Sequence, residues 1–321
     1  MKVLKFGGGC LKDAESIKKL PKILKNYQDD NILIVLSAFG KLTNMLEDND
    51  SFNKNYHHAE EFIKTIMCSL DFSQEKIDFI WNKNATLYWL SQNTDSVKSY
   101  PNRVCFGEYI SSEIISVFLA NIGVLNTLED AAFRVKTNSW DPISKSANFH
   151  SIQLQDDKKN TFPDFTDKLF AKQYWGPKRI KITQGFIASD VDNNIFVKQD
   201  LDTKNSVLNE DLLKRTTLGR EGSDYSAAIF GSAWLASQVI LFKDVDGVYT
   251  QDPKNYKDAE LFCQLNYDDA FKLCYAGSTV IHPKTINHLK LNNIPLLIKS
   301  FLDFNKPGTL ISNCASRLKI Q

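Results

Sequence analysis

Three features that often decide the class of a protein are scarce in this sequence of 321 residues. It has only six cysteines, with no C-x-x-C pair and without the regular spacing of a zinc site or a disulfide framework. Neither sign of charge is in excess, because 39 lysines and arginines face 38 aspartates and glutamates. No apolar run reaches the ~18 residues of a membrane span, and Met1 leads into a short strand pattern unlike a signal peptide. We therefore expect a cytoplasmic protein with free thiols, no membrane partner and no general attraction to nucleic acid.

The sequence does contain an alternation of short apolar runs and longer amphipathic stretches. The runs VLKF, NILIVLSAFG, RIKITQGFI, SQVILFKDVDGVY and IPLLIK have the nearly continuous apolar character of strands buried on both faces. Residues 13–24 have the pattern of an amphipathic helix with Asp13 as its N-cap. This alternation predicts an α/β fold, with helices on both faces of a mainly parallel sheet.

Two stretches interrupt the alternation. Residues 46–102 are rich in Asn, Lys and Glu and predict an all-helical, polar segment inserted like a small bundle. Residues 190–215 are polar and irregular, and part of this stretch reads as an insertion in a loop.

The first candidate site is the stretch VLKFGGGC near the amino terminus. A strand that ends at Lys5 and turns through Gly7, Gly8 and Gly9 into a helix points backbone N–H groups and the positive end of the helix at one spot, which suits phosphate. Lys5 could then reach the transferred phosphoryl group as a point charge. The alternative is a tight turn that needs glycine only for positive φ.

The second and third candidate sites follow later strands. Ser37 and Thr43 lie where a buried strand gives way to a helix, at the kind of edge where open α/β sheets bind ligands; alone, they also fit a turn and a cap. In TTLGREGSDYSAAIFG, Arg220 stands between glycines and offers a planar fork for a carboxylate. Ser223 and Asp224 begin the next helix. An N-cap would explain either, but a carboxylate at Asp224 could also hold the Lys5 ammonium in place.

The fourth candidate site is KDVDGVYTQDPK, residues 243–254. Its aspartates lack the spacing of a calcium loop, and its position after a strand favours nucleotide contacts. Tyr249 could place a ring beside a base, and Lys254 a charge near phosphates. An ordinary polar turn is the alternative reading.

Taken in order, these motifs resemble the catalytic domain of aspartate kinases, a branch of the amino acid kinase family. The matching runs, spread over almost the whole chain, are KFGGGCLKDAESI, VLSAFGKLTNML, FGEYISSEII, TTLGREGSDYSAAIFG, DVDGVYTQDPK, GSTVIHPKTI and IPLLIKSFLDFNKPGTLIS. The resemblance implies a three-layer α/β/α sandwich and ATP-dependent phosphorylation of the side-chain carboxylate of L-aspartate, the first step of lysine, threonine and methionine biosynthesis. Another amino acid kinase, acting on glutamate or a nucleoside monophosphate, and a non-catalytic paralogue that binds aspartate or ATP remain alternatives.

The resemblance also implies roles for individual residues. Those that match catalytic positions are Lys5 and Asp224. Those that match the aspartate pocket are Ser37, Thr43, Glu108, Arg220 and Ser223, with Glu108 facing the α-ammonium of the substrate. Those that match ATP-binding positions are Lys5, Gly7, Gly8, Gly9, Lys243, Asp244, Tyr249, Lys254, Thr279 and Val280. No residue is expected to form a metal site of its own, because Mg²⁺ would bridge the ATP phosphates through nucleotide oxygens and water.

The chain departs from the family pattern at several positions. Gly9 and Cys10 replace Thr-Ser, which removes a hydroxyl contact near the phosphates. Glu221 stands where glycine is usual, beside the expected carboxylate site. Thr279 replaces a lysine that contacts the nucleotide, and Tyr109 replaces an arginine that often follows the pocket glutamate.

The resemblance predicts one amino acid kinase domain over residues 1–321. Its N-terminal lobe, 1–205, would bind aspartate, and its C-terminal lobe, 206–321, the nucleotide. The chain ends just after PGTLIS, where family members under feedback control continue into ACT domains, so we expect no ACT domain and no inhibition by lysine or threonine through one. By resemblance alone, a homodimer is expected.

Overall fold

The computed structural model describes residues 1–47, 52–90, 96–138, 141, 143–152, 180–190, 215–275, 280–313 and 319–320. Within these ranges the main sheet is formed by β1 (Lys2–Phe6), β2 (Ile32–Leu36), β3 (Thr127–Glu129), β6 (Ile180–Gln184), β9 (Gln238–Lys243), β10 (Phe262–Leu265), β11 (Leu296–Ser300), β12 (Thr309–Ile311) and β13 (Lys319–Ile320). Their order is β13-β10-β12-β11-β9-β1-β2-β6-β3. Every neighbouring pair from β11 to β3 is parallel, whereas β12 runs antiparallel to β11. The predicted mainly parallel sheet is confirmed.

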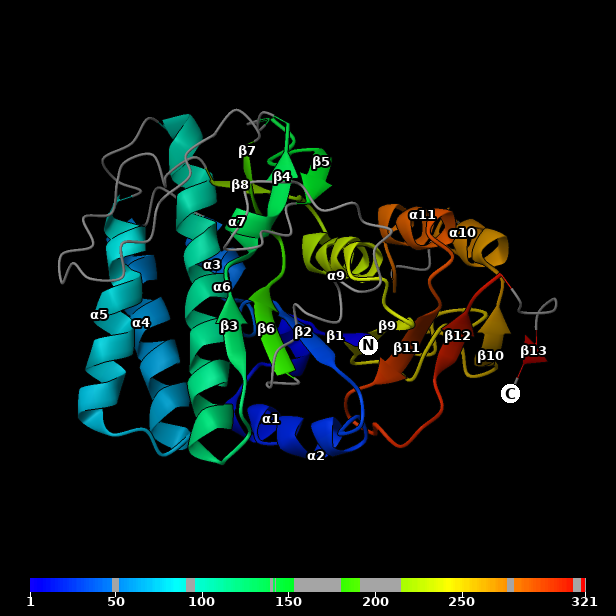
Figure 1. Cartoon of the computed structure of the whole chain (residues 1–321), viewed down its shortest axis with the longest axis horizontal. Coiled ribbons are helices and arrows are strands. Elements are labelled where there is room, and N and C mark those ends of the chain that lie inside the picture. Colours follow the sequence, from blue (N-terminus) through cyan, green and yellow to red (C-terminus); the bar gives the residue numbers. More distant parts are fainter. Residues whose placement is uncertain are drawn as a thin grey trace.

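Helices cover both faces of this sheet. The helices, as the structure has them, are the 3₁₀ turn η1 (Gly8–Cys10), α1 (Ala14–Ile17), α2 (Leu20–Lys25), α3 (Leu42–Glu47), α4 (Phe52–Ser69), α5 (Gln74–Leu90), α6 (Ser96–Asn121), α7 (Ala131–Arg134), α9 (Gly222–Ala233), α10 (Tyr267–Tyr275) and α11 (Pro283–Leu291). Figure 1 shows α9, α10 and α11 above the sheet, α1 and α2 below it, and α4 to α6 gathered at one end. The predicted three-layer α/β/α arrangement is therefore confirmed.

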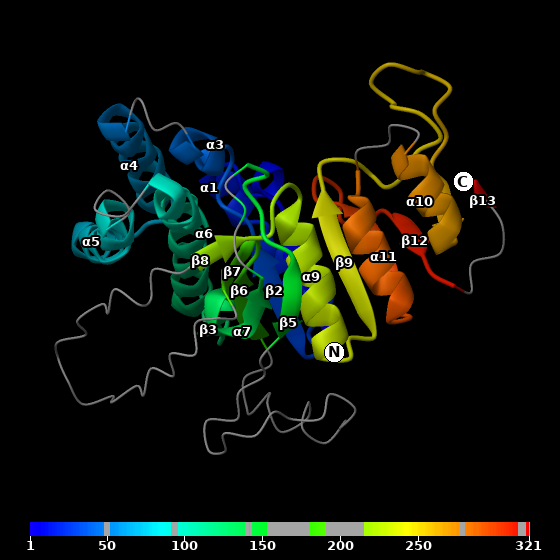
Figure 2. The same cartoon turned by 90° about the horizontal axis from the view of Figure 1, so that it is seen from above.

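A smaller sheet lies beside the first. It is formed by β4 (Val135–Thr137), β5 (Phe149–Ile152), β7 (Ile187–Asp190) and β8 (Arg215–Thr217), in the order β5-β4-β7-β8. Figure 2, which looks from above, shows β5 lying over β2, next to α9. Because β8 leads directly into the loop before α9, this sheet fixes where that helix begins.

Alternation along the central strands decides which side chains face α9. In β1, Leu4 and Phe6 belong to one buried apolar cluster, whereas Val3 belongs to the other, which includes the apolar side chains of α9. Side chains of a strand point to opposite faces in turn, so Lys5 lies on the same face as Val3, towards α9.

The neighbouring strand β9 obeys the same rule. Val239 and Leu241 pack in the cluster that contains α9, and Ile240 and Phe242 pack in the other. Two residues after Leu241, at the carboxyl end of the strand, Lys243 therefore faces α9 as well. Since β1 and β9 are parallel and pair Lys5 with Leu241, both lysines lie at the same edge of the sheet.

Two sequence-based expectations need correction. The helix predicted over residues 13–24 is two short helices, α1 and α2, because Pro21 lies in the first turn of α2 and cannot donate a backbone hydrogen bond within a longer helix. Asp13 is the N-cap as predicted, and its Oδ1 accepts a hydrogen bond from the Ser16 amide at 2.7 Å.

The segment 46–102 is helical where the structure describes it, but it is not a separate polar bundle. Its helices α4 and α5 contribute buried side chains to the main core, including Ile63, Met67 and Ile80. It has no boundary at residue 102 either, because α6 runs on to Asn121. Most of the stretch 190–215 lies outside the described residues.

Strands from both predicted lobes share the nine-stranded sheet, and the division at residue 205 stays a prediction. Among the helices that the structure describes, none is long and apolar enough to cross a lipid bilayer.

Candidate active site

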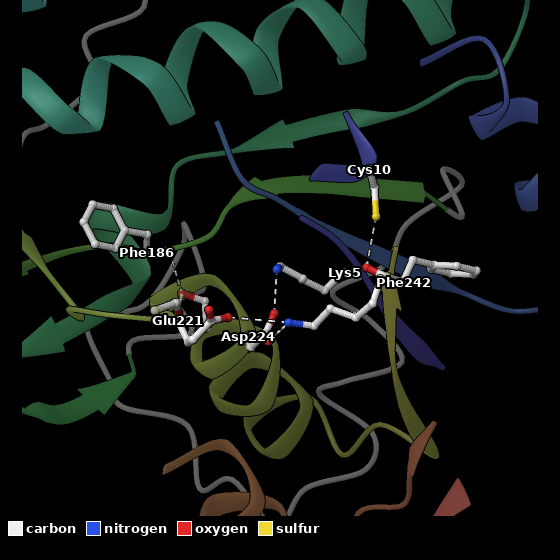
Figure 3. A network of polar contacts seen from close by, with 9 residues as sticks. Lys5, Cys10, Phe186, Glu221, Asp224 and Phe242 are labelled. Carbon is white, nitrogen blue, oxygen red and sulfur yellow. Dashed lines mark hydrogen bonds and ion pairs between the residues drawn. The ribbon is translucent and has the colours of Figure 1, made fainter. Parts of the chain in front are cut away.

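A buried cluster of charges lies at the carboxyl edge of the central strands. The Lys5 ammonium is 2.5 Å from Oδ1 of Asp224, and the Lys243 ammonium is 2.6 Å from Oδ2 of the same carboxylate. The side chain of Asp224 is fully buried, that of Lys5 is 5% exposed and that of Lys243 is 15% exposed. Figure 3 shows the Lys5 side chain reaching over the first turn of α9 to Asp224. One carboxylate therefore holds two ammonium groups.

The electrostatics of Asp224 follow from this geometry. Burial alone raises the pKa of a carboxyl group, but Lys5 and Lys243 more than reverse that effect and hold the pKa of Asp224 below its ordinary value. In turn, Asp224 raises the pKa of Lys243 against the opposing effect of burial. The carboxylate and the Lys243 ammonium thus stay ionised at neutral pH.

Asp224 is not the N-cap of its helix, and neither is Ser223. The cap position of α9 is Glu221, whose side chain makes no capping hydrogen bond and whose φ of 56° is left-handed. Asp224 lies in the first turn, where the positive end of the helix dipole also favours a carboxylate. Ser223 is buried against the loop after β6, since a Cβ at Gly185 would approach its Cβ to 2.6 Å.

The glycine turn after β1 joins the charge cluster to the next loop. A Cβ on Gly7 would lie 3.1 Å from the Lys5 Nζ, and a Cβ on Gly8 would lie 2.8 Å from the carbonyl oxygen of Ala38. The Gly40 amide also donates to the Gly8 carbonyl at 3.1 Å. Gly7 and Gly8 therefore let two strand-end loops and one ammonium meet, while Gly9 is exposed with open space around it.

A second acidic group lies on the other side of that loop. Glu108 of α6 is buried, and its Oε1 accepts a hydrogen bond from the Thr43 hydroxyl at 3.4 Å, whereas Oε2 is buried without a hydrogen-bond partner in the described part of the chain. Burial raises the pKa of Glu108 to about 8, against the lowering effects of the main chain at Ala38 and of Thr43. Ser37 is half-buried one residue before Ala38, and its amide donates to the Phe6 carbonyl at 3.2 Å.

Contacts that sequence reasoning missed position Glu108 and Thr43 relative to each other. The Ser111 hydroxyl accepts a hydrogen bond from the Phe39 amide at 3.0 Å, and a Cβ on Gly107 would lie only 3.1 Å from the Ala38 Cβ, so α6 packs tightly on the loop after β2. Arg103 donates from Nε to the Leu46 carbonyl and from Nη2 to the Glu47 carbonyl. It thereby caps the carboxyl end of α3, the helix that carries Thr43.

Two of these features had a sequence signal. Gly107 and Ser111 belong to FGEYISSEII, a run quoted for the family resemblance. Arg103 had no such signal, because a carbonyl cap more than fifty residues away in the sequence leaves no local pattern.

Arg220 lies in the loop before α9, four residues before Asp224. Its side chain is exposed and forms no ion pair or hydrogen bond with another described residue, which leaves its guanidinium open to a ligand. Glu221 does not turn away to solvent: Oε2 of its carboxylate is 3.5 Å from the Lys243 ammonium, and its side chain is 37% exposed. The departure from glycine at this position therefore adds a charge to the cluster itself.

Most of the remaining residues matched to the nucleotide lie in the loop after β9, and Val280 lies shortly before α11. Asp244 and Lys254 are exposed, and the Tyr249 hydroxyl donates to Oδ2 of Asp246 at 3.4 Å. Val280 is half-buried against the cluster that contains α9, and Thr279 lies outside the described residues. Of this set, the structure brings only Lys243 into contact with Lys5 and Asp224 through a shared carboxylate.

Two departures from the family pattern have a structural explanation. Cys10 is buried, and its thiol donates to the Phe242 carbonyl at 3.3 Å, so this side chain supports the sheet (Figure 3). Burial raises the pKa of Cys10 to about 11. Tyr109, in place of an arginine, packs its ring 5.1 Å from the guanidinium of Arg215, which brings a cation from β8 to this position.

The acidic groups of the site do not form a protein metal centre in the part of the chain that is described. Within those residues no three His, Cys, Asp or Glu side chains come together as ligands. Both carboxylate oxygens of Asp224 already bind lysine ammonium groups. Cations at this edge of the sheet are complementary to phosphate and carboxylate oxygens.

The amino acid kinase family model matches residues 1–300. The chain belongs to the amino acid kinase family. Among curated relatives of this family member, the bifunctional aspartokinase/homoserine dehydrogenase 2 of Arabidopsis thaliana is 27% identical over 314 residues, which are 96% of this chain and 32% of the relative. Aspartokinase 1 of the same plant is also 27% identical, over 99% of this chain and 53% of the relative. The chain thus spans about a third to a half of the length of these curated relatives.

Solved structures show the same fold. E. coli aspartokinase III in complex with aspartate and ADP superimposes with a TM-score of 0.75 at 24% identity, over 98% of this chain and 65% of that protein. The family member described here therefore shares the architecture of an aspartokinase.

Proposed function

We propose that this amino acid kinase transfers the γ-phosphoryl group of ATP to the side-chain carboxylate of L-aspartate, forming 4-phospho-L-aspartate. It would then be an aspartate kinase, a phosphotransferase with a carboxyl group as acceptor, acting in the first step of lysine, threonine and methionine biosynthesis. The similarity to aspartokinases over nearly the whole chain supports this substrate, and the E. coli enzyme with aspartate and ADP offers a matching pair of ligands.

The observation that carries the proposal is the continuous series of contacts between the cationic cluster at Lys5 and the buried acidic side chain of Glu108. Lys5 contacts Asp224, the Gly7–Gly8 turn lies between Lys5 and the loop at Ala38, and that loop packs on the helix of Glu108. A phosphate group suits the first end of this series. An ammonium group suits the second, where a carboxylate is buried with one oxygen unpaired among the described residues. L-aspartate carries both the ammonium and the reacting carboxylate.

The protein has two tasks in this reaction, to position the substrates and to neutralise charge on the transferred group. The substrate carboxylate is ionised at neutral pH and needs no general base. One of its oxygens bonds to the γ-phosphorus while the bond from phosphorus to the bridging oxygen of ADP breaks, and ADP leaves with that electron pair. Lys5 would neutralise charge on the transferred group. Arg220 and Ser223 would bind a substrate carboxylate, and Glu108, with Thr43 and Ser37 nearby, would receive the α-ammonium.

Mg²⁺ would enter with ATP and neutralise phosphate charge, bound by nucleotide oxygens and water. Gly7, Gly8 and Gly9 would lie against the phosphates, and Asp244, Tyr249, Lys254, Thr279 and Val280 would surround the nucleotide. We further propose a cytoplasmic homodimer with aspartate-binding and nucleotide-binding lobes, as the family resemblance implies.

The test measures ADP release by the purified chain with Mg²⁺-ATP and L-aspartate, L-glutamate or UMP, for the wild type and Lys5→Ala. We expect turnover with L-aspartate and a loss of about 10²-fold or more in kcat for Lys5→Ala, because removing one preorganised charge typically costs that much. Preference for glutamate or UMP would replace aspartate with another substrate of the family. Binding of aspartate and ATP without turnover would indicate a non-catalytic paralogue.

A further inference from the structure

The charge cluster contains a second ammonium, that of Lys243, which the family resemblance places among the ATP-binding positions without a part in the transfer itself. Lys243 reaches the cluster from the end of β9 and Lys5 from β1, and both bind the same carboxylate. Lys243 is more exposed than Lys5, and its second carboxylate contact, with Glu221, lies at the outer limit of an ion pair. The Lys243 ammonium therefore has a strong buried partner, Asp224, and a weak, more exposed one, Glu221.

We propose that Lys243 is a second catalytic ammonium, which binds oxygens of the transferring phosphoryl group beside Lys5, and that Glu221 occupies its outer side until those oxygens replace it. This inference rests on the proposed phosphoryl transfer; it gives Lys243 a part in the transfer step and adds Glu221 to the site.

The arrangement fits a displaceable contact. An ammonium has three donors, of which Asp224 takes one at 2.6 Å. The Glu221 carboxylate is 3.5 Å away and more than a third exposed, so solvent screens it and a phosphate oxygen can compete with it. The formal charges of Lys5, Asp224, Lys243 and Glu221 cancel. When Glu221 moves aside, one net positive charge faces the incoming anion.

The backbone at Glu221 supports a functional reason for this residue. Its φ of 56° lies in the left-handed region, where residues other than glycine are strained. The side chain nevertheless points into the cluster rather than away from it. Glycine would relieve the strain but would remove the only carboxylate that the described residues place on the outer side of Lys243.

A purely structural role for Lys243, as a counterion of Asp224, is the competing explanation. Both explanations predict some loss of stability when Lys243 is removed, so stability cannot separate them. The coupling between Glu221 and Lys243 in ATP binding can, because Glu221 competes with phosphate oxygens only if the Lys243 ammonium itself binds them, whereas a counterion of Asp224 that touches no ligand gives no such coupling.

The experiment is a double-mutant cycle of Lys243→Met and Glu221→Gln, with Lys243→Arg to keep the charge and Glu75→Gln as an exposed control on α5. Isothermal titration gives the Kd of Mg²⁺-ATP, ADP and L-aspartate, and steady-state kinetics give kcat. Circular dichroism verifies that each variant is folded.

We expect Lys243→Met to weaken ATP binding about 10-fold, to weaken ADP binding less, to leave L-aspartate binding unchanged and to lower kcat about 10²-fold. Lys243→Arg should retain most ATP affinity. Glu221→Gln should tighten ATP binding about 3-fold when Lys243 is present and have no effect in Lys243→Met, because the two residues act through one contact.

Three results would overturn the inference. One is ATP affinity and kcat within twofold of the wild type in folded Lys243→Met. Another is an equal effect of Glu221→Gln in both backgrounds. The third is a loss of L-aspartate rather than ATP affinity, which would assign Lys243 to a substrate carboxylate. Absence of ATP binding by the wild type would instead contradict the proposed function, so the two failures are distinguishable.

Discussion

Two carboxyl groups, Asp224 and Glu108, are both fully enclosed in this protein, yet their ionisation is shifted in opposite directions. The pKa of Asp224 is lowered because two ammonium groups outweigh the effect of burial. The pKa of Glu108 is raised to about 8 because burial outweighs hydrogen bonds from the main chain at Ala38 and Glu108 and from Thr43. The two acids differ in whether the protein supplies a cation.

This difference indicates that Asp224 organises the site, whereas Glu108 is available to bind a cationic group of a ligand. A buried charge is tolerated when it is paired and is costly when it is not. Asp224 is satisfied by Lys5 and Lys243, and in return it orders both lysines at the edge of the sheet. Glu108 keeps an oxygen without a hydrogen-bond partner among the described residues, so the cation that completes its pocket is expected from the ligand.

The largest effect is expected when the charge of the paired acid, Asp224, is removed. Asp224→Asn leaves two ammonium groups next to a neutral amide, and breaking a buried pair typically costs about 3–5 kcal/mol. We expect a loss of about that size in the free energy of unfolding in urea, and a loss of at least 10²-fold in kcat because Lys5 is no longer held. If Asp224→Asn kept wild-type stability and kcat, Asp224 would not be the organising group of the cluster.

Replacing the unpaired acid, Glu108, should have a smaller effect, which we expect in the KM for L-aspartate and not in kcat. Glu108→Gln keeps the shape of the side chain and removes its charge, so we expect little change in kcat and an increase of about 10-fold or more in the KM for L-aspartate. In the wild type, an ammonium ligand binds the ionised form of Glu108. The KM should therefore fall as pH rises towards about 8, by about tenfold per pH unit, and level off above it.

The Glu108→Gln variant is also the control for this pH dependence, because its KM should lack the inflection near pH 8. As pH rises towards 8, L-aspartate binding should improve, whereas the stability of the ligand-free protein should decrease. The folded-state pKa of Glu108 lies above its ordinary value of 4.5, so its contribution to stability is complete below pH 4.5 and is lost as pH rises through about 8. A wild-type KM that is flat between pH 6 and 9 would contradict the unpaired state of Glu108.

Much of the cationic side of the site could be predicted from sequence. The short apolar runs identified the central strands, and their order placed the glycine turn, Ser37 and the residues after β9 at one edge of the sheet. The contact between Lys5 and Asp224 was expected from residue chemistry alone. The functional roles of these residues stay predictions.

The rest depended on contacts between distant segments. The sequence placed Glu221 beside the expected carboxylate site but did not indicate its contact with Lys243, which Glu221 makes from a left-handed backbone, between the start of α9 and the end of β9. The polar appearance of residues 46–102 hid buried faces on α4 and α5, because such faces are a minority of each helix. By contrast, the N-cap of α11 is a local contact, in which Nδ1 of His282 accepts a hydrogen bond from the Lys284 amide.

The smallest expected effect concerns Arg215, whose guanidinium contacts Tyr109, the residue that follows Glu108 in α6. Arg215 donates from Nε to the Tyr109 hydroxyl at 3.1 Å, and that hydroxyl donates to Oδ1 of Asp130 at 2.8 Å. The Tyr109 hydroxyl thus links the guanidinium to Asp130. Tyr109→Phe removes the hydroxyl and keeps the ring, so we expect a loss of about 1 kcal/mol in stability and kinetic constants within about twofold.

The decisive measurement for Tyr109→Phe is the pH dependence of the KM for L-aspartate. If Arg215 stays with the ring and Asp130, Glu108 keeps its unpaired environment, and the inflection remains near pH 8. If the freed guanidinium turned to Glu108, the pKa of that acid would fall, because a cation within ion-pair distance favours the carboxylate. An inflection displaced by a full pH unit or more would then mean that the Tyr109 hydroxyl, and not distance alone, keeps Glu108 available for the substrate ammonium.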